Sequence, residues 1–251
     1  MQLLRNTTGG SAARYLIPLV SIAIGLTSGL AAATRATGVA TVCGLIALAV
    51  AAFAIVLGPQ VVRSDLREDL LHLELLKTWP IAPSSVVRGE MLAPVAMLTV
   101  IAWAAIVSAL ALSAAAFTRV PFAMRAWIAA ALAILAPAAI AAQFTVHNAA
   151  AIFFPAWVPL GPQRPRGLDA MGQRLILFFG IVFALGVMLL PGVVPAGLVW
   201  LVLNRFLGYA ALVASAAVLT AIVLVEVFVS TEVLGPAFER LDLTAVERAD
   251  V

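Results

Sequence analysis

Side chains that could do chemistry are few in this chain, and they gather in one stretch, from Arg63 to Glu90. Only 11% of the 251 residues are charged. A P-loop needs a glycine directly before its lysine, but Lys77, the only lysine, follows Leu76. The sequence also has no HExxH, no GxSxG and no paired carboxylates within its apolar runs. It therefore predicts no enzyme, and no ATP hydrolysis by a P-loop of its own.

The isolated polar residues outside that stretch predict no cofactor and no metal site. Cys43 is the single cysteine, which excludes an internal disulfide and a cysteine zinc cluster. His147 and Asn148 form either a polar site or a structural hydrogen-bonding pair at a helix end, and no second ligand lies at metal-binding spacing. Glu226 is either a proton-carrying group or a solvated glutamate, and its place near the polar tail favours the second.

Composition places the chain in the membrane class. It is 64% hydrophobic with a mean hydropathy of +1.12, and its apolar runs are continuous rather than alternating, which favours helices over a barrel. The formal charge of +3 comes almost wholly from arginine. We assign that basicity to cytoplasmic loops and not to a nucleic-acid surface. The prediction is an all-α integral membrane protein whose partner is the lipid bilayer.

The apolar runs predict one transmembrane domain, residues 1–251, with six spans. The spans are 15–33, 38–58, 91–113, 126–146, 175–190 and 206–230. A secretory signal competes for the first run, but that run exceeds a signal core and another apolar run follows at once.

Two groups of small or helix-breaking residues refine these spans. Gly25 and Gly29 form a GxxxG that lets a neighbouring helix approach closely. The apolar run from Leu175 to Leu203 is too long for one straight span, so we expect a break and a re-entrant segment over 191–203. The break residues are Pro191, Gly192, Pro195 and Gly197.

The polar stretch itself predicts an amphipathic helix over 65–78. Asp65 can cap it, with Glu68 three residues on, and Trp79-Pro80 ends it. A leucine stripe recurs at helical spacing and is widened by Leu71 and Leu75; its members are Leu66, Leu70, Leu73 and Leu76. Such a helix either lies on the bilayer surface facing a soluble partner or simply covers one end of the bundle.

Basic residues predict which side of the membrane this helix occupies. With six spans, the side that holds the termini, the 59–90 loop and the 147–174 loop carries eleven basic residues, ten arginines and Lys77, against four arginines on the other side. The positive-inside rule makes the first side cytoplasmic. Both termini and the helix 65–78 are therefore expected in the cytoplasm.

Three stretches resemble the membrane subunits of bacterial ABC exporters, the ABC-2 type permeases. They are VVRSDLREDLLHLELLKTWPIAPSSVVRGE, NAAAIFFPAWVPLGPQRPRGLDAMGQR and LGPAFERLDL. The resemblance implies six spans in the bacterial inner membrane, a cytoplasmic coupling helix after the second span and a re-entrant element between the fifth and the sixth. It also implies a separate ATP-binding subunit, which holds ATP and Mg²⁺, and a second permease half, identical or different.

Under this resemblance the helix 65–78 receives force from the ATPase and tilts spans two and three. Its charged edge and leucines would dock in a groove on that subunit: Asp65, Leu66, Arg67, Glu68, Asp69, Leu70, Leu73 and Glu74. The chain is shorter than many such permeases, and residues before Gly38 carry little of the resemblance. The chain is then a permease half, a compact permease or a chain with an alternative start.

Two other functions stay open at this point. A non-transporting scaffold or regulatory subunit would have the same spans but no partner ATPase. A proton-coupled carrier would need polar groups at mid-membrane depth, where spans one to five offer mainly serine, threonine, Cys43 and, toward an end, Gln143.

Overall fold

The described part of the chain consists of helices and short connections and contains no strand. The computed structural model describes residues 25, 29, 37–62, 66, 73–78, 80–155 and 168–241. The elements, listed in chain order, are α2 (Thr37–Val56), α3 (Gly58–Val61), α5 (Leu73–Lys77), α6 (Pro83–Ala116), α7 (Phe122–Phe153), α8 (Leu168–Leu207), η2 (Gly208–Ala210) and α9 (Ala211–Arg240). The prediction of an all-α protein is confirmed for these residues.

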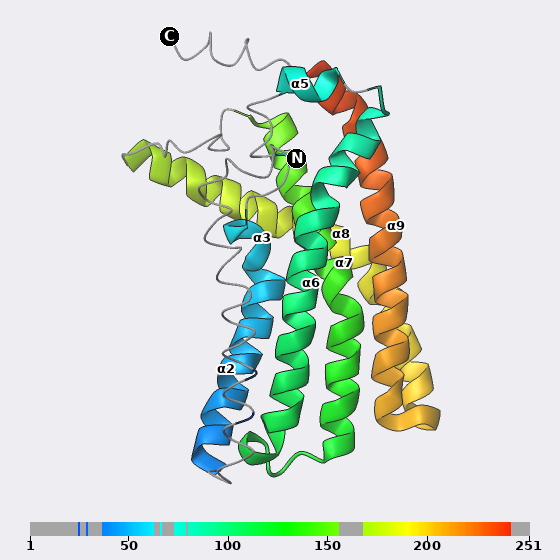
Figure 1. Ribbon diagram of the computed structural model, residues 1–251. Helices are drawn as coiled ribbons and strands as arrows, with labels where there is room; N and C mark the ends of the chain where they lie inside the picture. The colour runs from blue at the N-terminus through cyan, green and yellow to red at the C-terminus, as the bar shows by residue number, and fades with distance from the viewer. Residues whose placement is uncertain are drawn as a thin grey trace.

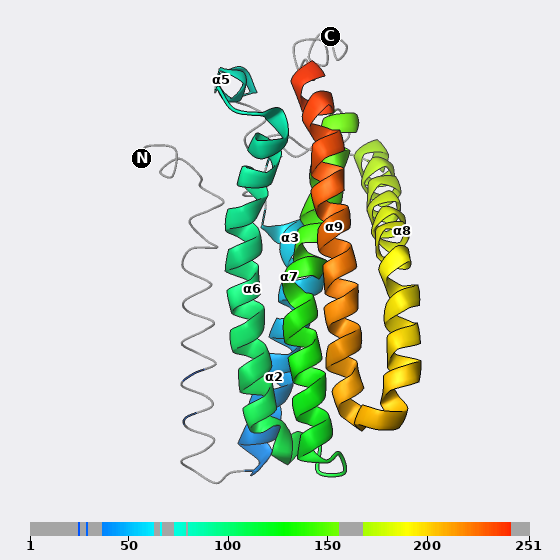
Figure 2. The same ribbon diagram turned by 90° about the vertical axis from the view of Figure 1, so that its right-hand side faces the viewer.

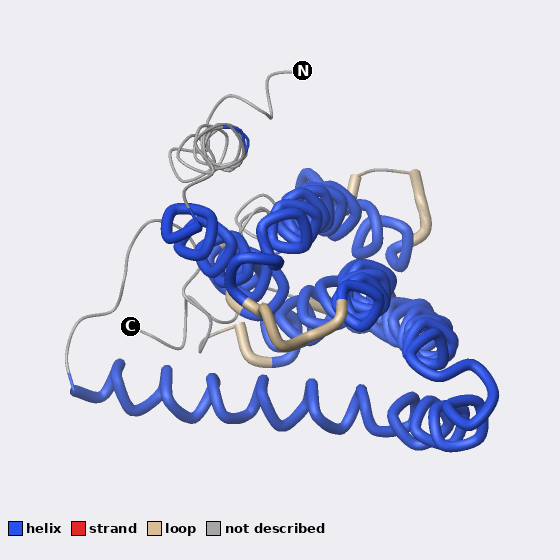
Figure 3. The backbone as a smooth tube through the Cα atoms, turned by 90° about the horizontal axis from the view of Figure 1, so that it is seen from below, coloured by secondary structure: helices blue, strands red, loops and turns tan. Residues whose placement is uncertain are grey.

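The long helices stand side by side as a bundle, with α7 inside it (Figures 1 and 3). All residues from Ala141 to Asn148 of α7 are buried, so neighbours cover this part of the helix on every side. Ile140 and Phe144 are fully buried there and pack with Leu98 of α6 and Phe238 of α9. Burying such side chains stabilises the bundle by about 1.5–3 kcal/mol each in water, and less in a bilayer, where lipid is the alternative contact.

Four stretches are long and apolar enough to cross a bilayer. They are Thr37–Val56, Pro83–Ala114, Phe122–Phe153 and a long stretch, Leu175–Arg240, that contains both α8 and α9. The last stretch turns back at Gly208, whose positive φ of 55° suits glycine. The protein is thus a multi-pass, all-α membrane protein. The predicted first span lies outside the described residues, apart from its two glycines.

Helices α6 and α7 are longer than the predicted spans 91–113 and 126–146. Helix α6 begins at Pro83, because proline is well suited to the first helical position. Helix α7 continues to Phe153 and ends just before Pro155, since the residue preceding a proline is steered away from helical geometry. His147 and Asn148 therefore lie inside α7, and their predicted place at a helix end is wrong.

Helix α8 changes direction along its length. Its first part runs across the bundle, and its second part runs antiparallel to α9 (Figures 2 and 3). Pro191 and Pro195 both lie inside the helix, and each removes one backbone hydrogen bond, which permits bending. The predicted helix break at residue 191 is wrong, since 191–203 continues the same helix. A re-entrant position for 191–203 remains a prediction.

The connections sort to the two ends of the bundle. Helix α5 lies at the end where α7 and α9 finish, whereas the α6–α7 connection and η2 lie at the opposite end (Figures 1 and 2). We call the first the α5 end. This grouping agrees with the predicted sorting of the 59–90 loop against Arg119 and Arg205.

Candidate functional site

Gln143 of α7 replaces a hydrogen bond that a proline removes. Pro59 has no N–H, so the carbonyl of Ile55 lacks its usual helical donor four residues on. The Gln143 side-chain Nε2 donates to that carbonyl oxygen. Gln143 is 5% exposed, and a buried, unpaired carbonyl is costly in an apolar surrounding. Gln143, which sequence analysis considered as a polar group of a proton-coupled carrier, therefore has a structural role.

Trp103 of α6 likewise replaces a backbone hydrogen bond that Pro137 of α7 removes. The carbonyl of Ala133 would normally accept from the N–H of residue 137, which proline lacks. The Trp103 indole N–H donates to the Ala133 oxygen instead, at 2.8 Å. The sequence carries no signal for this donor, since Trp103 and Ala133 are thirty residues apart.

The predicted helix 65–78 is described in part. Leu66 is helical and fully buried, and α5 covers Leu73–Lys77. Leu76 is 6% exposed and belongs to the core cluster, whereas Leu75 is 50% exposed. The helix ends before Thr78, one residue short of the predicted end. One leucine face therefore packs inward while Leu75 points away.

The other predicted docking residues cannot be placed. Asp65, Arg67, Glu68, Asp69 and Leu70 lie outside the described residues. The backbone of Leu73 and Glu74 belongs to α5. Their proposed contacts with an ATPase stay predictions.

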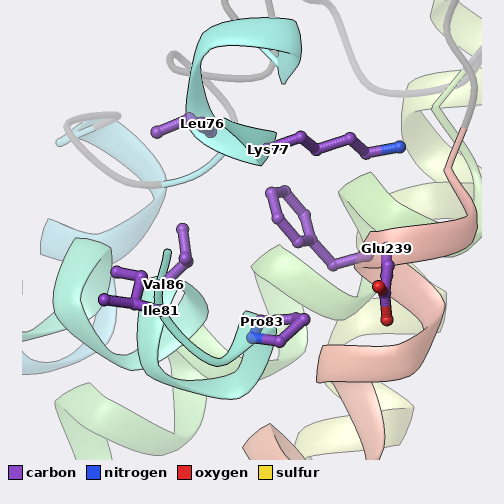
Figure 4. A pocket seen from close by; sticks show the side chains of 7 residues that line it. Leu76, Lys77, Ile81, Pro83, Val86 and Glu239 are labelled. Atoms are coloured by element: carbon purple, nitrogen blue, oxygen red, sulfur yellow. The ribbon is translucent and has the colours of Figure 1, made fainter. Parts of the chain in front are cut away.

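A pocket separates α5 from the ends of α6 and α9 (Figure 4). Its volume is about 260 Å³, and it is lined by Leu76, Lys77, Ile81, Pro83, Val86, Phe238 and Glu239. Lys77 extends across it toward α9, where its Nζ donates to the Leu241 carbonyl at 2.6 Å. A cation at a helix C-terminus is favourable. Helix α5 is thus seated on α6 and α9 with a gap beneath it.

Arg88 ties α6 to α9 below that pocket. Its Nε donates to Thr231 Oγ1 at 2.9 Å, and its Nη2 pairs with the Glu232 carboxylate. The guanidinium also lies over the Phe228 ring, 4.1 Å from the centroid. These three contacts hold the beginning of α6, directly after α5, against α9. Sequence analysis did not assign Arg88 any contact.

Glycine lets the same two helices approach closely one turn further on. A Cβ at Gly235 would stand 2.8 Å from the Ser84 backbone nitrogen. A methyl group has no room there. The backbones of α6 and α9 therefore approach closely at the α5 end.

Polar residues of α7 lie buried at the same end. Asn148 is fully buried, and neither Oδ1 nor Nδ2 has a hydrogen-bond partner among the described residues. His147 is 6% exposed. No group of three or more histidine, cysteine, aspartate or glutamate residues within the described ranges could hold a metal ion.

The predicted packing and break glycines have different surroundings. Gly25 and Gly29 are helical and exposed, and an added Cβ would meet nothing within 4 Å. Gly192 packs closely on α9, where its Cβ would lie 2.6 Å from Leu219 Cδ1, but Gly197 has open space. Of the two break glycines, only Gly192 packs closely on a neighbouring helix.

The fold and these contacts define a class: a multi-pass, all-α membrane protein with a short helix seated on one end of its bundle. Comparisons with protein-family models, with curated proteins and with solved structures found no match.

Proposed function

We propose that this chain is the membrane-spanning subunit of an ATP-driven exporter of the ABC-2 type, and that the α5 segment receives force from a separate ATP-binding subunit. The observation that carries the proposal is the seat of α5. It follows one apolar span and precedes the next, stands on the end of the bundle, and keeps Leu75 exposed while Leu76 is buried. The partner subunit would supply ATP and Mg²⁺.

Six spans are part of this proposal. The region 15–33 supplies the first, followed by α2, α6 and α7, and the two antiparallel helices of the last apolar stretch supply two more. In this arrangement the second part of α8, which contains 191–203, replaces 175–190 as the fifth span, so this proposal retains no re-entrant segment. The α5 end and both termini would face the cytoplasm of a bacterium. A second permease half would complete the transport unit.

The contacts of α5 also indicate where force would go. Lys77 bonds to the end of α9, Leu76 packs in the core, and Arg88 ties the next turns of α6 to α9. Force on α5 would therefore reach α6 and α9. The sequence-based expectation named spans two and three, so α9 is the added recipient.

The test is co-purification in mild detergent, followed by identification of the bound proteins. We expect an ATP-binding subunit with a Walker A motif to accompany the wild-type protein. Leu75→Asp should reduce its recovery at least roughly tenfold, because a charge replaces an exposed apolar contact at an interface. The protein should remain in the membrane, since Leu75 is not part of the core.

The matched control is Phe117→Asp, which places the same charge on an exposed apolar residue at the opposite end of the bundle. It should leave the recovered ATPase unchanged. Unchanged recovery with Leu75→Asp, or no ATP-binding protein with the wild type, would reject the proposal and favour a scaffold or regulatory subunit.

A further inference from the structure

Glu226 lies deeper in the bundle than the sequence indicated. The predicted last span ended at residue 230, but α9 continues to Arg240, so Glu226 falls in the middle of this helix. It is six positions before Glu232, or about 9 Å along the axis at 1.5 Å per residue. Residues 211–225 of α9 carry no charge. Glu226 is therefore the first acid of α9 and follows fifteen uncharged residues.

Its surroundings are apolar on the side of α8. Gly192 of α8 packs on Leu219 and Ile222 of α9. Because the two helices are antiparallel, one turn further along α9 brings Glu226 level with the turn of α8 at Met188. This is the region of the α8 bend, where Met188 and Leu189 pack beside Val223. Glu226 as a whole is half-buried, and its Oε2 is buried without a hydrogen-bond partner among the described residues.

The charged and titratable groups of the neighbouring helices offer no free counter-charge. From Leu175 to Asn204, α8 has no acid, base or histidine. In α6, Arg88 is engaged by Thr231 and Glu232, and Glu90 is another acid. In α7 the nearby polar groups are His147 and Gln143, and Gln143 is engaged by Ile55. An ionised carboxylate in such a place is expensive.

We propose that Glu226 is a binding site for one positive charge within the bilayer, at the bend of α8. Two sources have this chemistry: a proton, or the cationic head of an amphipathic cargo. The proton source is independent of the proposed export function, whereas the cargo source rests on it. Occupation of the site would affect the packing of α8 on α9, because Ile222, one turn before Glu226, lies against Gly192 of α8.

The test is labelling with dicyclohexylcarbodiimide, an apolar carbodiimide that enters membranes. The carboxyl oxygen adds to the central carbon, the carboxyl proton moves to a carbodiimide nitrogen, and the acyl group then shifts from oxygen to nitrogen. The stable N-acylurea adds the mass of one reagent, with no leaving group. Intact and peptide mass spectrometry of native membranes would locate the label.

We expect labelling at Glu226, lowered at least roughly tenfold in Glu226→Gln, which keeps the side-chain shape. The control Glu232→Gln removes an acid that is half exposed and paired, and should leave labelling unchanged. Equal labelling of wild type and Glu226→Gln would overturn the proposal. Gel filtration of each variant excludes loss of folding as the cause.

Two further measurements distinguish a bound proton from a bound organic cation. If a proton fills the site, Glu226 stays labelled at a pH where a soluble carboxylic acid labelled alongside has already lost its reactivity, and its own labelling falls only at higher pH. If an organic cation fills it, tetraphenylphosphonium competes with the label. Labelling that responds to neither condition would identify a buried structural acid and overturn the proposal. None of these results depends on an ATPase, so they are distinguishable from failure of the proposed function.

Discussion

Two prolines, Pro59 and Pro137, each leave a backbone carbonyl without its helical donor, and in both cases a side chain from another helix donates instead. Gln143 serves the Ile55 oxygen, and Trp103 serves the Ala133 oxygen. Bulk water is absent from the bilayer core, so a side chain from a neighbouring helix satisfies each freed carbonyl. Polar residues in such spans need not line a transport path.

The hydrogen bond from Trp103 to the Ala133 carbonyl can be tested, because a residue with an N–H at position 137 should make it unnecessary. Trp103→Phe should lower the free energy of unfolding by about 1 kcal/mol, since the Ala133 carbonyl loses its donor. In a Pro137→Ala background the loss should shrink, because residue 137 regains its N–H. Thermal unfolding in detergent measures both.

Trp127→Phe is the control for ring size, since Trp127 is 39% exposed. It should change stability little. An equal loss for Trp103→Phe with and without Pro137 would show that the indole acts through packing alone.

Arg88 should matter more than its ion pair alone. Arg88→Ala removes a hydrogen bond, a charge pair and a contact with the Phe228 ring, and we expect a loss of about 1–3 kcal/mol. Glu232→Gln should cost less than about 1 kcal/mol, because that carboxylate is half exposed and screened. Chemical unfolding of the two variants measures the difference, and equal losses would contradict it.

At this scale the sequence indicates which residues are unusual but not what they contact. Gln143 and Arg88 stand out in an apolar chain, yet their partners lie 88 and 143 residues away. Local periodicity carries no information about such pairs. His147 and Asn148 were misplaced because Val146 was taken as a helix end, whereas the next helix-ending proline is Pro155.

At the scale of elements, glycine sets how closely helices approach. Gly235→Ala should destabilise the protein by about 1–3 kcal/mol, because the new Cβ would meet the Ser84 backbone at 2.8 Å and backbone cannot move aside easily. Gly197→Ala has open space and should stabilise by about 0.5–1 kcal/mol through helix propensity.

The two changes are chemically identical and both lie inside long helices, so each controls for the other. Melting temperatures in one detergent give the comparison. A loss of similar size at both positions would mean that the α6–α9 approach is looser than described.

Helix existence was largely predictable, whereas helix ends and directions were not. Long apolar runs identified α2, α6, α7 and the α8–α9 region, because lipid-facing helices need apolar residues on all sides. Pro191 and Pro195 were read as a break, yet α8 continues through both and bends. Packing against neighbouring helices determines whether a proline breaks or only bends a helix. The local sequence carries no information about that packing.

At the scale of the whole molecule, orientation is the main remaining prediction from sequence. With Cys43→Ala as background, a single cysteine is placed at position 75 or at position 119, at opposite ends of the bundle. In intact cells an impermeant maleimide should label position 119 only. Position 75 should become labelled after the inner membrane is opened, because the basic excess predicts a cytoplasmic α5 end.

Labelling of position 75 in intact cells would reverse the orientation and remove α5 from the compartment that holds ATP. Immunoblotting of both variants controls for expression.

Global arrangement followed from charge and hydropathy only in part. The sorting of loops to two ends could be predicted, because each apolar crossing reverses the chain. The inward position of α7 could not, since its mixture of alanine, polar and aromatic residues resembles that of lipid-facing spans. The seat of α5 on α6 and α9 depends on contacts with residues near 240, far along the chain.

The occupied carbonyls at Pro59 and Pro137 have a mechanical consequence. A proline usually makes a helix easier to bend, since one backbone hydrogen bond is missing beside it. Here the hydrogen bonds from Gln143 and Trp103 to these carbonyls should stiffen the helices beside Pro59 and Pro137. Force applied to one end of the bundle would therefore tilt or rotate whole helices. It would cause little bending within α2 or α7.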